Sequence, residues 1–347
     1  MPDYDTDFHP ERRADVVRRR IKTIPRSILL FAALTLLAPI AFTVALIVDT
    51  ARFVLFRRPF MAIRMLAFGW IWLYTEMVGI TRFFLHWVGA GFGRNRKMMV
   101  ERAYKTQAWW ARVLFASVQR LFRLNLEVEG LDAANPGPVL AMFRHASIID
   151  NLLPAALLTD QRGLKLRWLI KKELLQVPSL DVGGNRLPNY FVDRNAQDPR
   201  EELRRIRALT QHLAEDEGLL IYPEGTRFTE SRRTRALEKL QESASHLYDR
   251  ASQLRYVLPP KVGGVLSLLD AKADPLICAH EGLGGFAKIK DIWSGAMLNR
   301  TIRVKFWRVS YDEVPKDRKG RVDWLFEQWE AIDTWIASVM PTEAAAN

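Results

Sequence analysis

Cysteine is almost absent from this sequence, and several familiar catalytic signatures are missing altogether. The single cysteine, Cys278, excludes an intrachain disulfide and a cysteine zinc site, and its apolar neighbours in the sequence are typical of a buried side chain. The six histidines include no pair at a metal-ligand spacing. Glycine-rich phosphate loops of the Walker or dinucleotide kind and the nucleophile elbow Gly-x-Ser-x-Gly are also absent. The sequence therefore gives no sign of a metal site, a nucleotide loop or a serine nucleophile.

Acidic residues are in deficit. The 347 residues contain 51 Lys and Arg against 39 Asp and Glu, which gives a formal net charge of +12. This excess favours anionic partners such as lipid head groups, nucleic acid or an acyl-coenzyme A. The basic residues cluster beside an apolar segment and not in an RNA- or DNA-binding module, so no nucleic acid is expected as a partner. With 49% hydrophobic residues, the chain can form one large α/β domain and a membrane-embedded segment.

The N-terminal part of the chain carries the membrane signal. Residues 1–26 form a basic tail suited to an anionic membrane surface, and residues 27–48 follow without a charge. That run is long enough to cross a hydrocarbon core of about 30 Å. Because Pro39 falls within it, the helix either kinks or forms a hairpin that returns to the side it entered. Basic residues flank both ends, so the topology stays open, and the long basic lead-in disfavours a cleavable signal peptide.

The remaining segments complete a division into five parts. Aromatic-rich residues 65–93 predict a helix in or dipping through the membrane interface, with a second span or an aromatic core helix as alternatives. The parts are a basic tail (1–26), membrane-embedded or interfacial helices (27–93), an amphipathic connecting helix (94–122), a main domain (123–320), and a C-terminal amphipathic helix with a tail (321–347). Strand patterns in the main domain predict an α/β fold, with a mixed central sheet of about six or seven strands flanked by helices.

The main domain contains a polar turn with a histidine and an aspartate. His145 comes shortly after the apolar run 138–142, and Asp150 lies five residues beyond it. A histidine at the carboxyl end of a strand suits a general base, and a carboxylate on its other ring nitrogen would fix the tautomer and stabilise the imidazolium. The alternative is structural, because Ser147-x-x-Asp150 also fits a helix capping box.

A second polar turn, Tyr-Pro-Glu-Gly-Thr-Arg at residues 222–227, also follows a buried-strand pattern. Arg227 would grip a phosphate with two N–H groups, and Gly225 would let the backbone approach closely. Glu224 would hold the arginine or a substrate hydroxyl. A turn with a surface salt bridge is the alternative.

Together the two turns resemble the lysophospholipid and glycerolipid acyltransferase family, whose first block is His-x-x-x-x-Asp and whose third is Glu-Gly-Thr-Arg. Residues 189–194 resemble the second block, Gly-x-x-Phe-Ile-x-Arg, except that Pro188 stands in place of the glycine. Residues 257–264 resemble the proline-containing fourth block. The resemblance covers roughly residues 120–315, and the region after the third block looks most like the branch that contains the lysocardiolipin acyltransferases.

This resemblance implies a membrane-bound acyltransferase that moves a fatty acyl group from a thioester to a hydroxyl of a lysophospholipid such as 1-acylglycerol 3-phosphate. His145 and Asp150 would be the catalytic pair, and Arg194 and Arg227 would hold the acceptor phosphate. Glu224, Gly225 and Thr226 would shape the same pocket. Further candidates are Phe191, Arg144 and Pro259. Many members have Asn in place of Arg144, so the acceptor head group is open.

The donor would be acyl-coenzyme A or an acyl-carrier-protein thioester, used as a substrate, with no bound cofactor or metal. Transfer would be direct, without an acyl-enzyme. An integral or monotopic membrane protein is expected, with its catalytic domain facing the cytoplasm. The alternatives are a different acceptor (a lysocardiolipin-type lipid or glycerol 3-phosphate), acyl exchange between phospholipids without coenzyme A, and a non-catalytic membrane-binding protein in which His145 and Asp150 only cap a helix.

Overall fold

A seven-stranded sheet forms the centre of the main domain in the computed structural model, which describes residues 11–193, 198–284 and 289–340. The strands lie in the order β1-β7-β6-β2-β5-β3-β4. They are β1 (Asn125–Glu129), β2 (Val139–Phe143), β3 (Lys165–Lys171), β4 (Tyr190–Val192), β5 (Glu217–Ile221), β6 (Asp274–Glu281) and β7 (Thr301–Arg308). All neighbours are parallel except β6 and β7. The predicted mixed α/β fold is confirmed.

The strand order brings distant parts of the sequence together at one edge of the sheet. β2 lies between β5 and β6, and all three strands are parallel. Every residue of β2 and β5 is buried, as expected for central strands covered on both faces. The segments that leave these strands at their carboxyl ends are therefore neighbours, at a strand spacing of about 4.8 Å.

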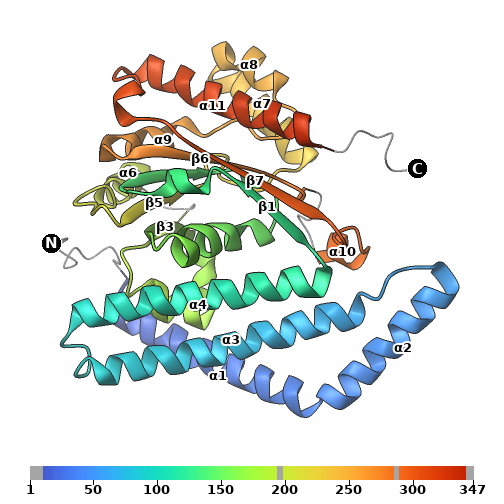
Figure 1. Cartoon of the computed structure of the whole chain (residues 1–347). Coiled ribbons are helices and arrows are strands. Elements are labelled where there is room, and N and C mark those ends of the chain that lie inside the picture. The colour runs from blue at the N-terminus through green and yellow to red at the C-terminus, as the bar shows by residue number, and fades with distance from the viewer. Residues whose placement is uncertain (1–10, 194–197, 285–288, 341–347) are drawn as a thin grey trace.

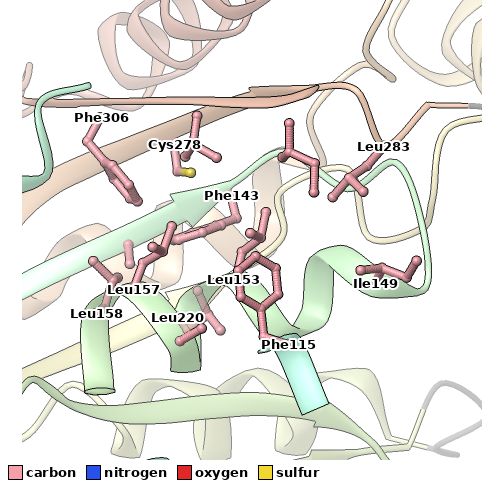
Figure 2. Close-up of a cluster of buried hydrophobic side chains, with 14 of the residues drawn as sticks. Phe115, Phe143, Ile149, Leu153, Leu157, Leu158, Leu220, Cys278, Leu283 and Phe306 are labelled. Atoms are coloured by element: carbon pink, nitrogen blue, oxygen red, sulfur yellow. The ribbon is translucent and has the colours of Figure 1, made fainter. Parts of the chain in front are cut away.

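Helices cover both faces of the sheet (Figure 1). Alternation along β2 divides its side chains between two cores, with Ala141 and Phe143 in one and Leu140 and Met142 in the other. The first core is closed by α4 (Arg96–Phe122) and the short helical segment Pro154–Gln161. Figure 2 shows Phe143 among other buried side chains of this core, including Leu153 and Phe306.

The second core lies beneath the helices on the opposite face. They include α6 (Pro199–Ala208), α9 (Val262–Leu268) and α11 (Arg318–Val339), whose Trp329 is fully buried. The other α-helices described in the main domain are α5 (Pro178–Gly184), α7 (Glu230–Ser243), α8 (Tyr248–Gln253) and α10 (Ile289–Trp293).

Three helices precede α4 and pack on its side of the molecule: α1 (Arg13–Leu36), α2 (Ala38–Phe56) and α3 (Ala62–Gly89) (Figure 1). The helix is interrupted at Leu37. Pro39 is the second residue of α2, a position where a residue without an N–H loses no helical hydrogen bond. The uncharged run 27–48, expected as one membrane segment, is therefore divided between two helices. Among the described residues, one helix, α2, is long and apolar enough to cross a membrane.

Basic residues assigned to the N-terminal tail lie in α1 and contact the main domain. The guanidinium groups of Arg19 and Arg20 donate hydrogen bonds to the buried carboxylate of Asp181 on α5, at 2.9 and 3.2 Å. The carboxylate of Glu76 on α3 accepts a hydrogen bond from the backbone N–H of Ser179 at 3.0 Å. These contacts fix α1 and α3 to the domain, so two of the cations expected at a lipid surface are used within the protein.

Candidate active site

The His145 turn places a carboxylate against the imidazole. His145 Nδ1 lies 3.0 Å from Asp150 Oδ1. The other oxygen of Asp150 accepts the backbone N–H groups of Ala146 and Ser147, at 2.6 and 2.7 Å. Asp150 is fully buried, and Ser147 Oγ accepts the N–H of Ile149. One carboxylate therefore both stabilises the turn and contacts the imidazole. The expected capping box does not form, because the following 3₁₀ helix (Ile149–Leu152) has Ile148 as its N-cap and no side-chain cap.

The environment of Asp150 keeps its carboxylate ionised. Burial alone would raise the pKa of Asp150, but its hydrogen bond with His145 and the backbone N–H of Ser147 outweigh burial and lower that pKa below its usual value. An anion on Nδ1 leaves Nε2 as the nitrogen that can take a proton from a substrate. The side chain of His145 is 15% exposed, so it is mostly enclosed but keeps some access to solvent.

Tyr222 completes the immediate surroundings of His145, although it was not predicted as a site residue. Its ring lies on the imidazole, with 4.5 Å between ring centroids. Its hydroxyl donates a hydrogen bond to the backbone carbonyl of Asp150 at 3.4 Å. Burial and the nearby Asp150 raise the pKa of Tyr222 well above its usual value, so the phenol is neutral. The available signal was its place at the end of β5, a strand adjacent to β2.

Glu224 connects three of the sequence blocks. One of its carboxylate oxygens accepts the backbone N–H of His145 at 2.7 Å, and the other accepts that of Leu258 at 2.9 Å. Its side chain is buried, and burial raises its pKa to about 8 against the opposing effect of Arg144. The expectation that Glu224 holds Arg227 or a substrate hydroxyl differs from this geometry, because both oxygens are directed at backbone groups inside the protein.

Arg144 lies beneath the site, not at its surface. Its guanidinium is buried and donates hydrogen bonds to the backbone carbonyls of His280 and Tyr256, the latter at 2.8 Å. His280 Nε2 lies 3.0 Å from the carbonyl oxygen of Arg144 and 3.7 Å from the carboxylate of Asp150. Burial lowers the pKa of His280 to about 4, so it is neutral near neutral pH. Arg144, a further candidate from the sequence, therefore packs as part of the support of the His145 turn.

The glycine of the second turn has the conformation that this residue type favours. Gly225 has a φ of +65°, and its N–H donates to the carbonyl of Tyr222 at 2.8 Å. A Cβ atom at this position would lie 2.9 Å from Lys261 Nζ. The backbone N–H of Lys261 also donates to the carbonyl of Pro223 at 2.8 Å. Lys261 is thus a cation beside the turn that was not predicted as a site residue, although it lies in the fourth block.

The other predicted site residues are placed as follows. Thr226 and Arg227 are half-buried in the turn after β5. Pro259 is buried in the segment that Glu224 holds, and Phe191 of β4 packs with Ile170 and Leu175. Both are therefore packing residues. Arg194 lies outside the described residues, but β4 ends at the same edge of the sheet as β2, three strands away. The described residues hold no group of three or more His, Cys, Asp or Glu side chains arranged for a metal ion.

The region that contains both polar turns matches a known family. The sequence model of a family described as Acyltransferase matches residues 125–275, which include both polar turns. Residues 125–275 of this chain therefore form an acyltransferase domain. No curated protein matches it in sequence.

The fold of this acyltransferase is similar to one solved by crystallography, that of the 1-acyl-sn-glycerophosphate (LPA) acyltransferase PlsC from Thermotoga maritima. The similarity has a TM-score of 0.50 and covers 81% of this chain and 100% of that chain, at 12% sequence identity. At this identity the similarity establishes the fold. The enzyme class follows from the family, and the polar turns of the acyltransferase lie where an α/β sheet commonly carries its site, at the carboxyl ends of adjacent strands.

Proposed function

We propose that this acyltransferase moves a fatty acyl group from an acyl thioester to a hydroxyl of a lysophospholipid such as 1-acylglycerol 3-phosphate. The single observation that carries the proposal is the His145–Asp150 pair. The 3.0 Å contact at Nδ1, together with an aspartate fixed by two backbone N–H groups, gives a histidine oriented for general base catalysis. The activity in the name of the similar solved enzyme favours a glycerophosphate-type acceptor.

In the proposed reaction, His145 Nε2 takes the proton of the acceptor hydroxyl as its oxygen attacks the thioester carbonyl. The new ester C–O bond forms, the C–S bond breaks, and the leaving thiolate receives the proton from the imidazolium. Asp150 carries the compensating negative charge throughout, because its pKa stays low. Transfer is direct, so no acyl-enzyme forms. Coenzyme A and the acyl carrier protein are the two candidate donors.

The acceptor phosphate is assigned to the cations of the second, third and fourth blocks. Arg227 follows the Gly225 turn, and Lys261 lies beside that turn. A planar guanidinium offers a phosphate two parallel N–H donors, which an ammonium cannot. Arg194 is proposed as a second phosphate ligand from its place in the second block. Thr226 and Gly225 shape the turn between His145 and these cations.

Membrane association is assigned to α1 and α2. Large apolar side chains are exposed around the break between these helices, including Leu36, Leu37 and Ile40, and the cations lie at the far ends of both helices. This distribution favours a re-entrant hairpin whose apolar elbow enters the lipid while its basic ends stay at the head groups. The catalytic domain is then expected on the cytoplasmic side, next to soluble thioesters.

The test is a product assay with purified protein. The detergent-purified enzyme and a His145→Ala variant are incubated with labelled long-chain acyl-coenzyme A and a panel of acceptors: 1-acylglycerol 3-phosphate, lysophosphatidylglycerol, lysocardiolipin and glycerol 3-phosphate. The wild type is expected to form diacyl product and free thiol, and His145→Ala to form neither. The matched control is His246→Ala, which changes an exposed histidine in the short helical segment Ser245–Leu247 after α7.

Each result decides a different part of the proposal. Product from His145→Ala at a rate near that of the wild type would exclude this base. Product from the wild type only with glycerol 3-phosphate or lysocardiolipin would keep the base and change the acceptor. If no acceptor reacts with acyl-coenzyme A, an acyl-carrier-protein donor is supplied, and failure with both donors overturns the thioester proposal.

A further inference from the structure

A second basic site lies away from His145, between the end of α2 and α10. It is a pocket of about 520 Å³. Three cations, two aromatic rings and a serine line it: Arg52, Phe56, Arg58, Lys290, Trp293 and Ser294. No carboxylate is among the lining residues. Cations beside aromatic and apolar surface suit an anionic group carried on an amphiphile. Both helices lie at the right of Figure 1, away from the centre of the sheet.

One wall of this pocket is fixed by Arg52. Its guanidinium lies 3.9 Å from the ring centroid of Trp293 and donates to the backbone carbonyl of Trp293 at 3.0 Å. Arg52 also lies 3.5 Å from the buried carboxylate of Asp49. That carboxylate accepts the backbone N–H groups of Met61, Ala62 and Ile63 at the start of α3, and it is therefore committed to the protein. Arg52 holds the two helices together across 241 positions of sequence.

The other two cations are available to a ligand. Arg58 and Lys290 are exposed. Within the described part of the chain, neither side chain takes part in a hydrogen bond or an ion pair. The pocket therefore presents two uncompensated cations, on two segments that the contact of Arg52 with Trp293 holds together. An anion of matching size would compensate them without displacing a partner.

The position of the pocket indicates where that anion comes from. α2 has 19 residues, which corresponds to a length of about 28 Å, close to the thickness of a hydrocarbon core of about 30 Å. Large apolar side chains are exposed along its length, from Ile40 to Phe56, and the helix leads into Arg57 and Arg58 at its end. When this apolar length lies in the lipid, Arg57, Arg58 and the pocket beside them lie at the level of the head groups. This step rests on the membrane insertion of α2 given under the proposed function.

We propose that this pocket binds the phosphate of an anionic membrane phospholipid, at a site separate from the acceptor site at His145. Arg58 and Lys290 contact the phosphate, Arg52 supplies a fixed charge behind them, and the rings of Phe56 and Trp293 contact the glycerol and upper acyl chain. The lipid bound here anchors the end of α2 against α10. It is a structural ligand and not a substrate.

Flotation with lipid vesicles tests this proposal without requiring catalysis. Purified protein is mixed with vesicles of phosphatidylcholine alone or of an equal mixture with phosphatidylglycerol. The wild type is expected to bind the mixed vesicles more strongly. Arg58→Gln with Lys290→Gln should weaken binding to mixed vesicles about 30-fold, because each cation near an anionic surface contributes about fivefold. Binding to phosphatidylcholine alone should change little. Arg235→Gln with Lys239→Gln, on exposed α7, is the control of equal charge.

Ser294→Trp separates a built pocket from a diffuse positive surface. This change fills the pocket and keeps every cation, so it should reduce the preference for phosphatidylglycerol while the control pair does not. Equal losses in the pocket pair and the control pair, or a normal preference in Ser294→Trp, would overturn the proposal. A normal preference in the pocket pair with a raised KM for acyl-coenzyme A would assign the pocket to the phosphates of the donor instead. A failure of catalysis alone leaves the flotation result standing.

Discussion

Glu224 and His145 are joined through the backbone: the carboxylate of the second turn accepts the N–H of the histidine in the first, at 2.7 Å. The other oxygen of Glu224 accepts the N–H of Leu258 at 2.9 Å. A single buried side chain therefore connects the His145 turn to the Glu224 turn and to the segment that contains Leu258. Its contribution to activity is one of position, since its contacts are with the backbone.

Replacement of this carboxylate by an amide tests that assignment. In Glu224→Gln, one oxygen becomes an NH₂ group that faces a backbone N–H, so one of the two hydrogen bonds is lost and the His145 turn shifts. A misplacement of about 1 Å can cost about 100-fold in rate, so we expect kcat to fall by about 10- to 100-fold with little change in the acceptor KM. Steady-state kinetics separates the two quantities.

Glu242→Gln, at an exposed residue of α7, is the matched control and should behave as the wild type. A raised acceptor KM with an unchanged kcat in Glu224→Gln would instead mean that Glu224 contacts the substrate. That outcome would restore the role expected from the sequence.

Asp150→Asn removes the charge that faces His145 and keeps the size of the side chain. The asparagine cannot stabilise an imidazolium on Nδ1 as a carboxylate does, and its NH₂ group conflicts with either the Nδ1–H or the two backbone N–H groups. General base catalysis contributes about 10²- to 10⁴-fold, so we expect a loss of kcat in that range. Single-turnover rates under saturating donor would measure it. Loss of less than tenfold would argue against His145 as the base.

Arg227→Lys tests the proposed phosphate contact. A point charge cannot replace the two parallel donors of a guanidinium, so the KM for 1-acylglycerol 3-phosphate should rise by about 10-fold or more, while thermal stability changes little. The rate with a monoacylglycerol, which has the hydroxyl but no phosphate, should be the same in both proteins. Equal losses with both acceptors would mean that Arg227 supports the turn and not the phosphate.

The sequence predicted the elements with the strongest local signals. β2 and β5 were found because continuous apolar runs end in polar turns, and these strands are buried along their whole length. Asp150 was placed correctly beneath His145 because the contact spans only five positions, within reach of a single turn. The break at Leu37 was harder to place, because Pro39 indicated a disturbance in the helix but not the residue at which it ends.

Contacts between distant segments could not be predicted in the same way. The motif that contains Glu224 does not say whether its carboxylate points outward, and its partner Leu258 lies 34 positions later. Tyr222 and His280 reach the His145 turn only because β5 and β6 flank β2 in the sheet. A strand order that brings together residues from three separate blocks depends on the packing of the whole domain, and local propensity carries little information about it.

His280 gives the last prediction, because its burial couples folding to pH. Its pKa in the folded protein is about 4, against 6.5 when it is unfolded and exposed. Between these two values the unfolded chain binds a proton at this residue that the folded protein does not, so the contribution of His280 to stability falls as the pH decreases from about 6.5 to about 4. Glu224, whose pKa is raised in the folded protein, acts in the opposite direction and is the same in the wild type and the variant. The full difference corresponds to about 3 kcal/mol.

His280→Gln keeps an N–H donor near the carbonyl of Arg144 and cannot be protonated, so it should lose less stability over this range. Thermal unfolding in detergent at a series of pH values measures the effect, with the exposed His246→Gln as the control that should follow the wild type. Protonation of Asp150 acts in a separate range, below its usual pKa of 3.8, so the two groups can be distinguished. Parallel curves for the wild type and His280→Gln would show that the buried histidine is not the group responsible.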